Sequence, residues 1–239
     1  VEGCAQTRVI SDGKSVDKLV YAIITEDGQL VSRSEKTLGS GFSSSLTTTM
    51  AISMARGCTY KAVFWAQSSL CEAYELSDDL IVSVDYSGVG NDESRDAFFG
   101  VSTSFTLDDA QAEVVLRRPF AQLNVGAYPF DWEYAVGFHD FDVVKSSVMV
   151  REVPHRLNLL DGTVSGCVNA RFAPGDLPAQ MLRADVDENG VDEEYTYLSM
   201  SYILAGGEAT AHSADVYFMD AEGRTVMMEN DALSSVELR

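Results

Sequence analysis

The stretch Val114–Ala127 reads VVLRRPFAQLNVGA, two apolar runs separated by Arg117, Arg118 and Pro119. Proline has no N–H to donate to a sheet ladder, so Pro119 excludes one continuous central strand across the stretch. We therefore predict two strands, over residues 113–116 and 120–126, with a break between them. The stretch holds no nucleophile, general base or metal ligand. It predicts architecture and not chemistry.

Short candidate strands continue on both sides of this stretch. Leu19–Thr25 and Gln29–Ser32 flank Glu26-Asp27-Gly28, a tight-turn sequence that predicts a hairpin. Thr59–Gln67 is apolar on both alternating faces, which is typical of a central strand. Further strands are expected at residues 43–54, 80–86, 96–101, 145–153, 163–171, 195–205, 215–219 and 225–228.

One segment favours a helix, and the rest favours antiparallel sheets. Asp131–His139 is expected to form a short helix with Asp131 as its cap, although Gly137 weakens it. Many short strands, Gly-centred turns and at most one or two short helices predict an all-β fold of antiparallel sandwiches.

The chain length allows one large β domain or two sandwiches, and we favour two. The chain has 239 residues, against roughly 100 for a single sandwich. Phe172–Asp176 and Pro178 interrupt the pattern of strands, so the boundary is expected in this neighbourhood. The expected domains are residues 1–165 and residues 166–239.

The charge is strongly negative and excludes two classes of partner. The chain has 17 Lys and Arg against 37 Asp and Glu, a net charge of -20. Such a surface repels phosphate backbones and anionic lipid, so we expect no nucleic-acid or membrane-surface binding. Solubility explains the acidity most simply, and a specific cationic partner is the alternative.

The cysteines indicate neither a zinc site nor a thioredoxin-type motif. Cys4, Cys58, Cys71 and Cys167 are widely spaced and include no C-x-x-C pair. Cys58 and Cys71 could form a disulfide if their strands are neighbours. Cys4 superficially resembles the cysteine of a lipoprotein cleavage box, but Glu2 stands where a small residue is required and no hydrophobic region precedes it. No apolar run approaches the roughly 18 residues that a spanning helix needs.

No motif for catalysis is present, so we expect no enzyme. His139, His155 and His212 lie in separate segments, without a second ligand at helical spacing or a neighbouring Ser or Cys in a known motif. G-x-S-x-G, H-E-x-x-H, P-loop and G-x-G-x-x-G patterns are also missing. A spatial arrangement of distant residues is left open.

Asp185–Gly190 matches the first half of a calcium loop. In the pattern D-x-[DN]-x-[DN]-G, alternate side-chain oxygens meet at one hard cation, here from Asp185, Asp187 and Asn189, with Glu193 as a further donor. The twelfth position is Thr196 and not the bidentate Glu, and no helices flank the loop. Asn-Gly is equally typical of a hairpin turn. Apart from this candidate calcium ion, we expect no cofactor.

The two tryptophans differ in expected exposure. Trp65 lies in the most strand-like apolar stretch, so core packing is favoured over a role in sugar stacking. Trp132, between Asp131 and Glu133, is the one candidate for an exposed platform.

Six segments, in this order and spacing, resemble the fimbrillin-like (type V pilin, Mfa-like) surface proteins of Bacteroides-type bacteria. They span most of the chain: Tyr60–Gln67, Asn91–Gly100, Arg117–Ala127, Leu157–Gly166, Tyr197–Ala205 and Asp215–Gly223.

The resemblance implies two tandem transthyretin-like β-sandwich domains in an exported lipoprotein at the outer membrane, as a pilus (fimbria) subunit or an accessory tip or anchor subunit. Membrane attachment would come only through a lipid anchor. Subunits of this family polymerise by strand exchange: a protease, often arginine-specific, removes the first strand, and a neighbour donates a replacement. Arg8 is the expected processing site. The partners implied are other pilin subunits and surface glycans or proteins of host or bacterium.

Both ends of the chain depart from the family pattern. Only Val1–Gln6 precedes Thr7-Arg8, so the first strand is expected to be clipped. Ser235–Arg239 stops before the further strand residues that members usually carry, so the donor strand is expected to be missing. The alternative function is a monomeric surface adhesin or glycan-binding lipoprotein with the same fold.

Overall fold

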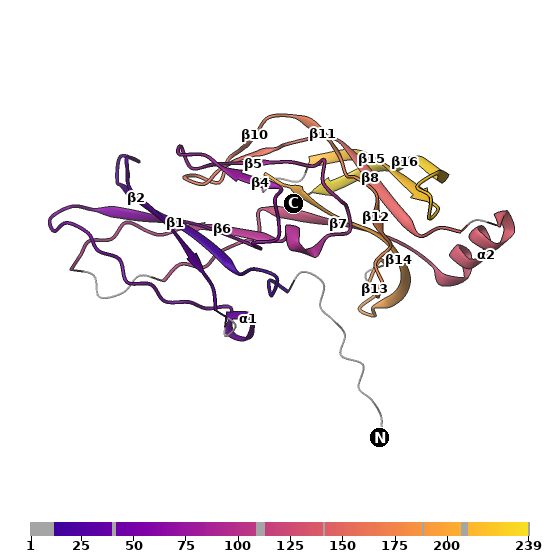
Figure 1. The fold of residues 1–239 in the computed structure, drawn as a ribbon, viewed down its shortest axis with the longest axis horizontal. Helices are drawn as coiled ribbons and strands as arrows, with labels where there is room; N and C mark the ends of the chain where they lie inside the picture. Colours follow the sequence, from indigo (N-terminus) through magenta and orange to yellow (C-terminus); the bar gives the residue numbers. More distant parts are fainter. Residues whose placement is uncertain are drawn as a thin grey trace, which may run out of the picture. The chain divides into compact units, whose positions relative to one another are not determined.

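The computed structural model describes residues 12–39, 42–108, 113–140, 142–187, 189–206 and 210–238 (Figure 1). The chain forms two compact units. Unit 1 comprises the chain up to Glu72, Glu93–Arg118 and Leu159–Asp161. Unit 2 comprises Ala73–Asp92, Pro119–Asn158 and Gly162–Arg239. The chain therefore passes between the units several times.

This division differs from the single boundary expected between residues 165 and 166. Two strands that precede that boundary, β7 (Phe120–Ala127) and β8 (Lys145–Val153), pair with strands that follow it. Their partners are β14 (Glu193–Leu204) and β15 (Thr210–Met219). Main-chain hydrogen bonds thus hold sequence-distant strands in one unit.

Unit 1 contains one four-stranded sheet in the order β2-β1-β3-β6. The strands are β1 (Lys18–Thr25), β2 (Leu30–Thr37), β3 (Tyr60–Gln67) and β6 (Ala97–Val101). The predicted hairpin is confirmed as β1 and β2, and Gly28 supplies its positive φ of 85°. Strand β3 is central, as predicted, and both of its faces are buried.

Two segments of unit 1 expected to be strands are not. Residues 43–54 begin in the short helix α1 (Phe42–Ser45) and continue without regular structure. Residues 113–116 form no strand, and only the backbone of Arg117 bridges to Phe99, with N···O distances of 2.8 and 2.9 Å. A 3-10 turn, η1 (Glu93–Arg95), precedes β6.

The break at Arg117-Arg118-Pro119 is the point where the chain leaves unit 1. The guanidinium of Arg118 donates two hydrogen bonds to the carboxylate of Asp96, at 2.6 and 2.9 Å. Asp96 is only 1% exposed, so this bidentate pair satisfies a buried charge. The next residue, Pro119, belongs to unit 2 and accepts a hydrogen bond from the main chain of Ala205. Strand β7 then begins at Phe120, as predicted.

Unit 2 contains three sheets, whose strand orders are β10-β9-β5-β4, β11-β8-β15-β16 with β12 also on β8, and β13-β14-β7. The remaining strands are β4 (Tyr74–Leu76), β5 (Ile81–Val84), β9 (Arg156–Asn158), β10 (Val164–Ser165), β11 (Val168–Arg171), β12 (Gly175–Asp176), β13 (Met181–Ala184) and β16 (Thr225–Leu238). All named strand pairs in both units are antiparallel. The prediction of an all-β fold with few helices is confirmed.

Asn91 ties three elements of unit 2 together. Its backbone is left-handed, with φ of 59°, a conformation that asparagine tolerates better than most residues. Its side-chain Nδ2 donates to Ser146 Oγ at 3.0 Å in β8 and to the carbonyl of Asp176 at 2.9 Å in β12. Its Oδ1 accepts from the main chain of Met200 at 2.7 Å in β14. The loop around Asn91, just before the chain returns to unit 1 at Glu93, is therefore fixed to β8, β12 and β14.

Helix α2 (Pro129–His139) connects β7 and β8 at the periphery of unit 2 (Figure 1). The helix lies where the sequence predicts it, but its start differs from the expectation. Tyr128 is the N-cap residue, without a side-chain cap, and Pro129 occupies the first turn. Asp131 therefore lies inside the first turn, where its charge suits the helix dipole. The helix ends at Asp140, which is left-handed with φ of 53°.

Candidate functional site

The three histidines lie on different elements and in different surroundings. His139 is exposed at the end of α2, with its ring 5.0 Å from that of Phe138. His212 in β15 is buried, and its Nδ1 lies 3.1 Å from the carbonyl oxygen of Arg151. His155 packs against Gly166, where a Cβ atom would lie 2.2 Å from the ring. These contacts give each ring a packing environment, and the structure does not assemble the three into one site.

Three of the four proposed calcium residues, Asp185, Asp187 and Asn189, lie in the loop that joins β13 to β14. The carboxylate of Asp185 accepts hydrogen bonds from the main-chain N–H groups of Asn189, at 2.9 Å, and Gly190, at 2.7 Å. Gly190 has φ of 85°, as a tight connection requires. Asp187 Oδ2 accepts from the side chain of Asn189 at 2.9 Å. Because β13 and β14 are antiparallel neighbours, this loop is a hairpin connection.

The fourth expected ligand, Glu193, is bound elsewhere. Its Oε2 accepts hydrogen bonds from the hydroxyls of Tyr195, at 2.7 Å, and Tyr128, at 3.2 Å. Within the described part of the chain, no three His, Cys, Asp or Glu side chains are grouped to hold a metal. Calcium binding stays a prediction, which titration calorimetry with calcium chloride would test.

The Glu193 carboxylate changes the acidity of its neighbour. The hydrogen bond from the Tyr195 hydroxyl to Glu193 raises the pKa of that tyrosine well above its usual range. A second hydrogen bond with Tyr128 and burial of the ring act in the same direction. The rings of Tyr128 and Tyr195 are also in contact, with centroids 5.0 Å apart. Since Tyr128 caps α2, this cluster fixes the start of the helix to β14.

The two tryptophans are both packed, to different degrees. Trp65 is 1% exposed, and its indole N–H donates to Gln67 Oε1 at 2.7 Å, which confirms its assignment to the core. Trp132 is half-buried, with its ring 5.2 Å from that of Phe218 in β15. The expectation of an exposed platform at Trp132 is therefore wrong, because its ring anchors α2 to the sheet.

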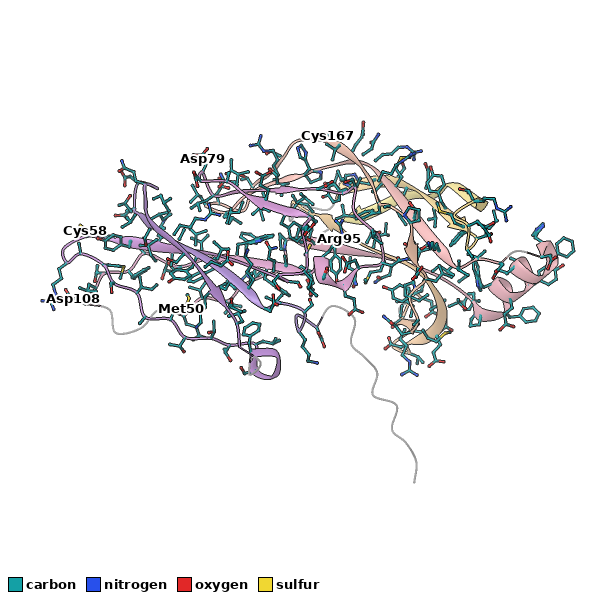
Figure 2. All side chains as sticks on the ribbon, in the orientation of Figure 1. Met50, Cys58, Asp79, Arg95, Asp108 and Cys167 are labelled. Atoms are coloured by element: carbon teal, nitrogen blue, oxygen red, sulfur yellow. The ribbon has the colours of Figure 1, made fainter. Side chains whose placement is uncertain are left out.

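The exposed aromatic surface lies on the opposite side of α2. Phe130, Tyr134 and Phe138 are 78%, 63% and 70% exposed, and Tyr128 at the helix start is 53% exposed. In the described ranges, every exposed Phe, Tyr or Trp is one of these four. Side chains project from α2 away from the strands of unit 2 (Figure 2). We call Phe130, Tyr134 and Phe138 the aromatic face of α2.

The spacing of the aromatic face follows from helix geometry. Residues four positions apart lie on the same side of a helix, one turn above another. The rings of Tyr134 and Phe138 accordingly stack, with centroids 5.7 Å apart and 23° between their planes. The sequence signal was the repeat Phe130, Tyr134, Phe138 in a helix that begins with Pro129. This repeat was not recognised in the sequence, where only Trp132 was named as a candidate for an exposed aromatic residue.

Open sheet edges are the second surface feature. Strand β2 forms one edge of the unit 1 sheet and carries the exposed Glu35 and the half-buried Arg33 and Lys36. Lys18 pairs with Glu35 at 2.9 Å across the β1–β2 ladder. Charges of this kind discourage unspecific strand pairing. In unit 2, the long strand β16 forms the edge of its sheet beside β15.

The other expected features are placed as follows. Cys58 is exposed and Cys71 is buried, and the two do not form a disulfide with each other. Cys58 and Cys167 both lie at the surface (Figure 2). Cys4 and Arg8 lie outside the described residues. Among the described residues, no helix is long and apolar enough to cross a membrane.

Two solved structures from Bacteroides species share the fold of this chain. A protein of Bacteroides thetaiotaomicron VPI-5482 proposed to bind polysaccharide (DUF1812) has a TM-score of 0.53 and 14% identity, over 90% of this chain and 72% of that one. A proposed adhesin from Bacteroides ovatus has a TM-score of 0.50 and 14% identity, over 90% and 69%. The fimbrial anchor protein Mfa2 from Porphyromonas gingivalis is less similar, with a TM-score of 0.44 and 12% identity over 91% and 74%.

These similarities show that the chain shares its fold with the two Bacteroides proteins. No curated protein matches the sequence. Residues 4–239 match a family described as a family of unknown function, DUF6562. Because the match covers almost the whole sequence, the chain belongs to the DUF6562 family.

Proposed function

We propose that this chain is a non-enzymatic, exported cell-surface protein of the fimbrial type, a pilus subunit or an accessory tip or anchor subunit. The observation that carries this proposal is the all-β fold shared with a proposed Bacteroides adhesin at a TM-score of 0.50. The sequence resemblance to fimbrillin-like proteins supports it independently. Fold similarity alone does not transfer function, so the assembly mechanism needs a direct test.

Assembly would proceed by strand exchange. A donated strand gains main-chain hydrogen bonds along an open sheet edge, and its alternate side chains fill apolar pockets. The unit 1 sheet has a core suited to this role, because the buried side chains of β1 and β3 supply an apolar face. That face includes Leu19, Ile23 and Phe64. Under this mechanism, cleavage after Arg8 would release residues 1–8, and the remaining chain would accept a strand from a neighbouring subunit.

An arginine-specific protease tests the mechanism. We expect the full-length protein to form ladders that resist warm detergent after digestion, and Arg8→Lys to prevent them. Arg56→Lys, in the segment between α1 and β3, is the matched control, since it removes an exposed arginine elsewhere and should leave the ladders unchanged. Monomers only, in the digested wild type, would contradict strand exchange. Ladders from Arg8→Lys would contradict Arg8 as the processing site.

The cellular location follows from the same proposal. An exported subunit of this kind would be attached to the outer membrane through a lipid anchor or incorporated in a fimbrium. Fractionation of the native bacterium, with the chain detected by antibody, should place it in the outer-membrane and sheared-fimbria fractions. Recovery only from the cytosol would contradict export.

A monomeric surface adhesin that binds glycans is the second candidate. The observation in its favour is the fold shared, at a TM-score of 0.53, with a protein proposed to bind polysaccharide. Retention of the purified full chain on immobilised bacterial polysaccharides would support this function. If the protein also stays monomeric after protease treatment, the adhesin replaces the polymer subunit as the conclusion.

A further inference from the structure

Helix α2 is apolar on two opposite sides, and only one of them is covered. Trp132, Ala135 and Val136 form the half-buried side, where Trp132 contacts Phe218. At about 3.6 residues per turn, the aromatic face lies opposite these residues. A surface helix normally places polar residues on its outer side. In α2, the rings of the aromatic face are exposed, so they do not contribute to the core of unit 2.

Such a concentration of exposed rings is unusual for a soluble surface. Single exposed apolar residues are common and need no explanation, whereas contiguous apolar surface marks interaction sites. Here the exposed Phe and Tyr side chains of the described residues are confined to Tyr128 and the aromatic face, within eleven consecutive positions of the chain. The exposure is therefore local to one helix and not a general property of the chain.

The charge around the aromatic face has one sign. Residues 128–142 contain four carboxylates and no Lys or Arg, the acidic residues being Asp131, Glu133, Asp140 and Asp142. Helical geometry places Asp131 and Glu133 on either side of the aromatic face. Both are exposed. Together with the net charge of -20, this arrangement repels anionic lipid and phosphate and attracts cations.

We propose that the aromatic face of α2 binds an arginine-bearing, positively charged segment of a partner protein. A guanidinium stacks on aromatic rings and at the same time pairs with carboxylates, which matches rings flanked by Asp131 and Glu133. The chain already uses this chemistry internally: the guanidinium carbon of Arg118 lies 5.0 Å from the ring centroid of Phe98 while its nitrogens bind Asp96. The inference does not depend on assembly by strand exchange.

A short synthetic peptide that alternates arginine and leucine is the probe, titrated into the full chain by fluorescence anisotropy. We expect Tyr134→Ala/Phe138→Ala to weaken its binding by about tenfold or more, although this variant keeps the net charge. Asp131→Asn/Glu133→Gln should also weaken binding and reduce its dependence on salt. A lysine-leucine peptide should bind less tightly than the arginine peptide.

The matched control is Val186→Ala/Val191→Ala. These exposed apolar residues lie in another acidic loop of the same unit, so their loss should leave binding unchanged. Equal binding of the peptide to wild type and to the Tyr134→Ala/Phe138→Ala variant would overturn the proposal, because charge alone would then explain the binding. Binding of a glutamate-leucine peptide, a neutral polysaccharide or lipid vesicles at the aromatic face, without binding of the arginine peptide, would overturn it as well.

Discussion

Strand β3 and helix α2 are both rich in aromatic residues, and they use them in opposite ways. In β3, Tyr60, Phe64 and Trp65 are all buried. In α2, Trp132 is half-buried, while Phe130 and Phe138 are exposed. The difference follows from position: β3 lies between β1 and β6, whereas α2 lies at the periphery of unit 2.

The comparison separates stability from recognition. A ring enclosed on all sides contributes its full transfer free energy to folding. A ring that stays in water contributes little to folding and keeps that free energy available for a partner. Aromatic content therefore does not reveal the role of a segment, and exposure does. Substitutions in β3 and α2 test this difference between buried and exposed aromatic residues.

The largest effect is expected at the centre of β3. Trp65→Ala removes a fully buried ring and leaves a cavity, so the free energy of unfolding should fall by about 3–5 kcal/mol. The indole hydrogen bond to Gln67 is lost as well. Urea denaturation followed by circular dichroism measures the change. Trp65→Phe, which keeps most of the ring, should lose less, and a loss below about 1 kcal/mol in Trp65→Ala would contradict the assignment to the core.

An intermediate effect is expected at the covered side of α2. Trp132→Ala removes a half-buried ring that contacts Phe218, so the free energy of unfolding should fall by about 1–3 kcal/mol. The same denaturation experiment applies. An unchanged free energy of unfolding in Trp132→Ala would mean that Trp132 does not anchor α2. The two sides of the helix would then not differ in their contribution to stability.

Local sequence signals predicted the elements of this fold better than their assembly. The β1–β2 hairpin follows from Asp27-Gly28, and the strands expected at residues 215–219 and 225–228 lie in β15 and β16. The polar run 43–54 was mistaken for a strand because it alternates, although no neighbouring strand pairs with it. Strand propensity reflects packing against neighbours, which a single sequence does not contain.

The pairing of distant strands and the orientation of the side chains of α2 could not be predicted from the sequence. The pairing of β7 with β14 joins segments separated by about 70 residues, and no local pattern records it. The network around Asn91 likewise depends on three distant elements. In the candidate site, the helix was predicted but its exposed side was not, since α2 is apolar on two opposite sides and the sequence does not show which of them faces the sheet.

A smaller effect is expected at the tyrosine cluster that holds the start of α2. The raised pKa of Tyr195 means that folding keeps its phenol protonated. This stabilises the protein below the unfolded pKa of about 10 and is lost as pH rises through the folded pKa. Glu193→Gln removes the charge that accepts the hydrogen bond, so the pKa of Tyr195 should move back toward its usual value. Absorbance at alkaline pH measures the shift, with Tyr195→Phe assigning the signal.

Stability against alkaline pH gives a second measurement of the same cluster. Between about pH 10 and the folded pKa, the wild type should lose stability because only the unfolded state releases the phenolic proton. Glu193→Gln should lose less stability over this range. An unchanged slope in the variant would show that the Tyr195–Glu193 hydrogen bond does not control the titration.

The smallest effect on folding is expected on the aromatic face itself. Tyr134→Ala and Phe138→Ala should each change the free energy of unfolding by no more than about 0.5 kcal/mol, because both rings are exposed. The substitutions remove the contact between the two rings and, for Phe138, the contact with the exposed His139. Thermal denaturation compares them with Trp132→Ala in the same helix. A destabilisation as large as that of Trp132→Ala would mean that the aromatic face is covered within this chain, and the rings would then be core residues like those of β3. Near-neutral stability combined with lost peptide binding would separate the two roles within one helix.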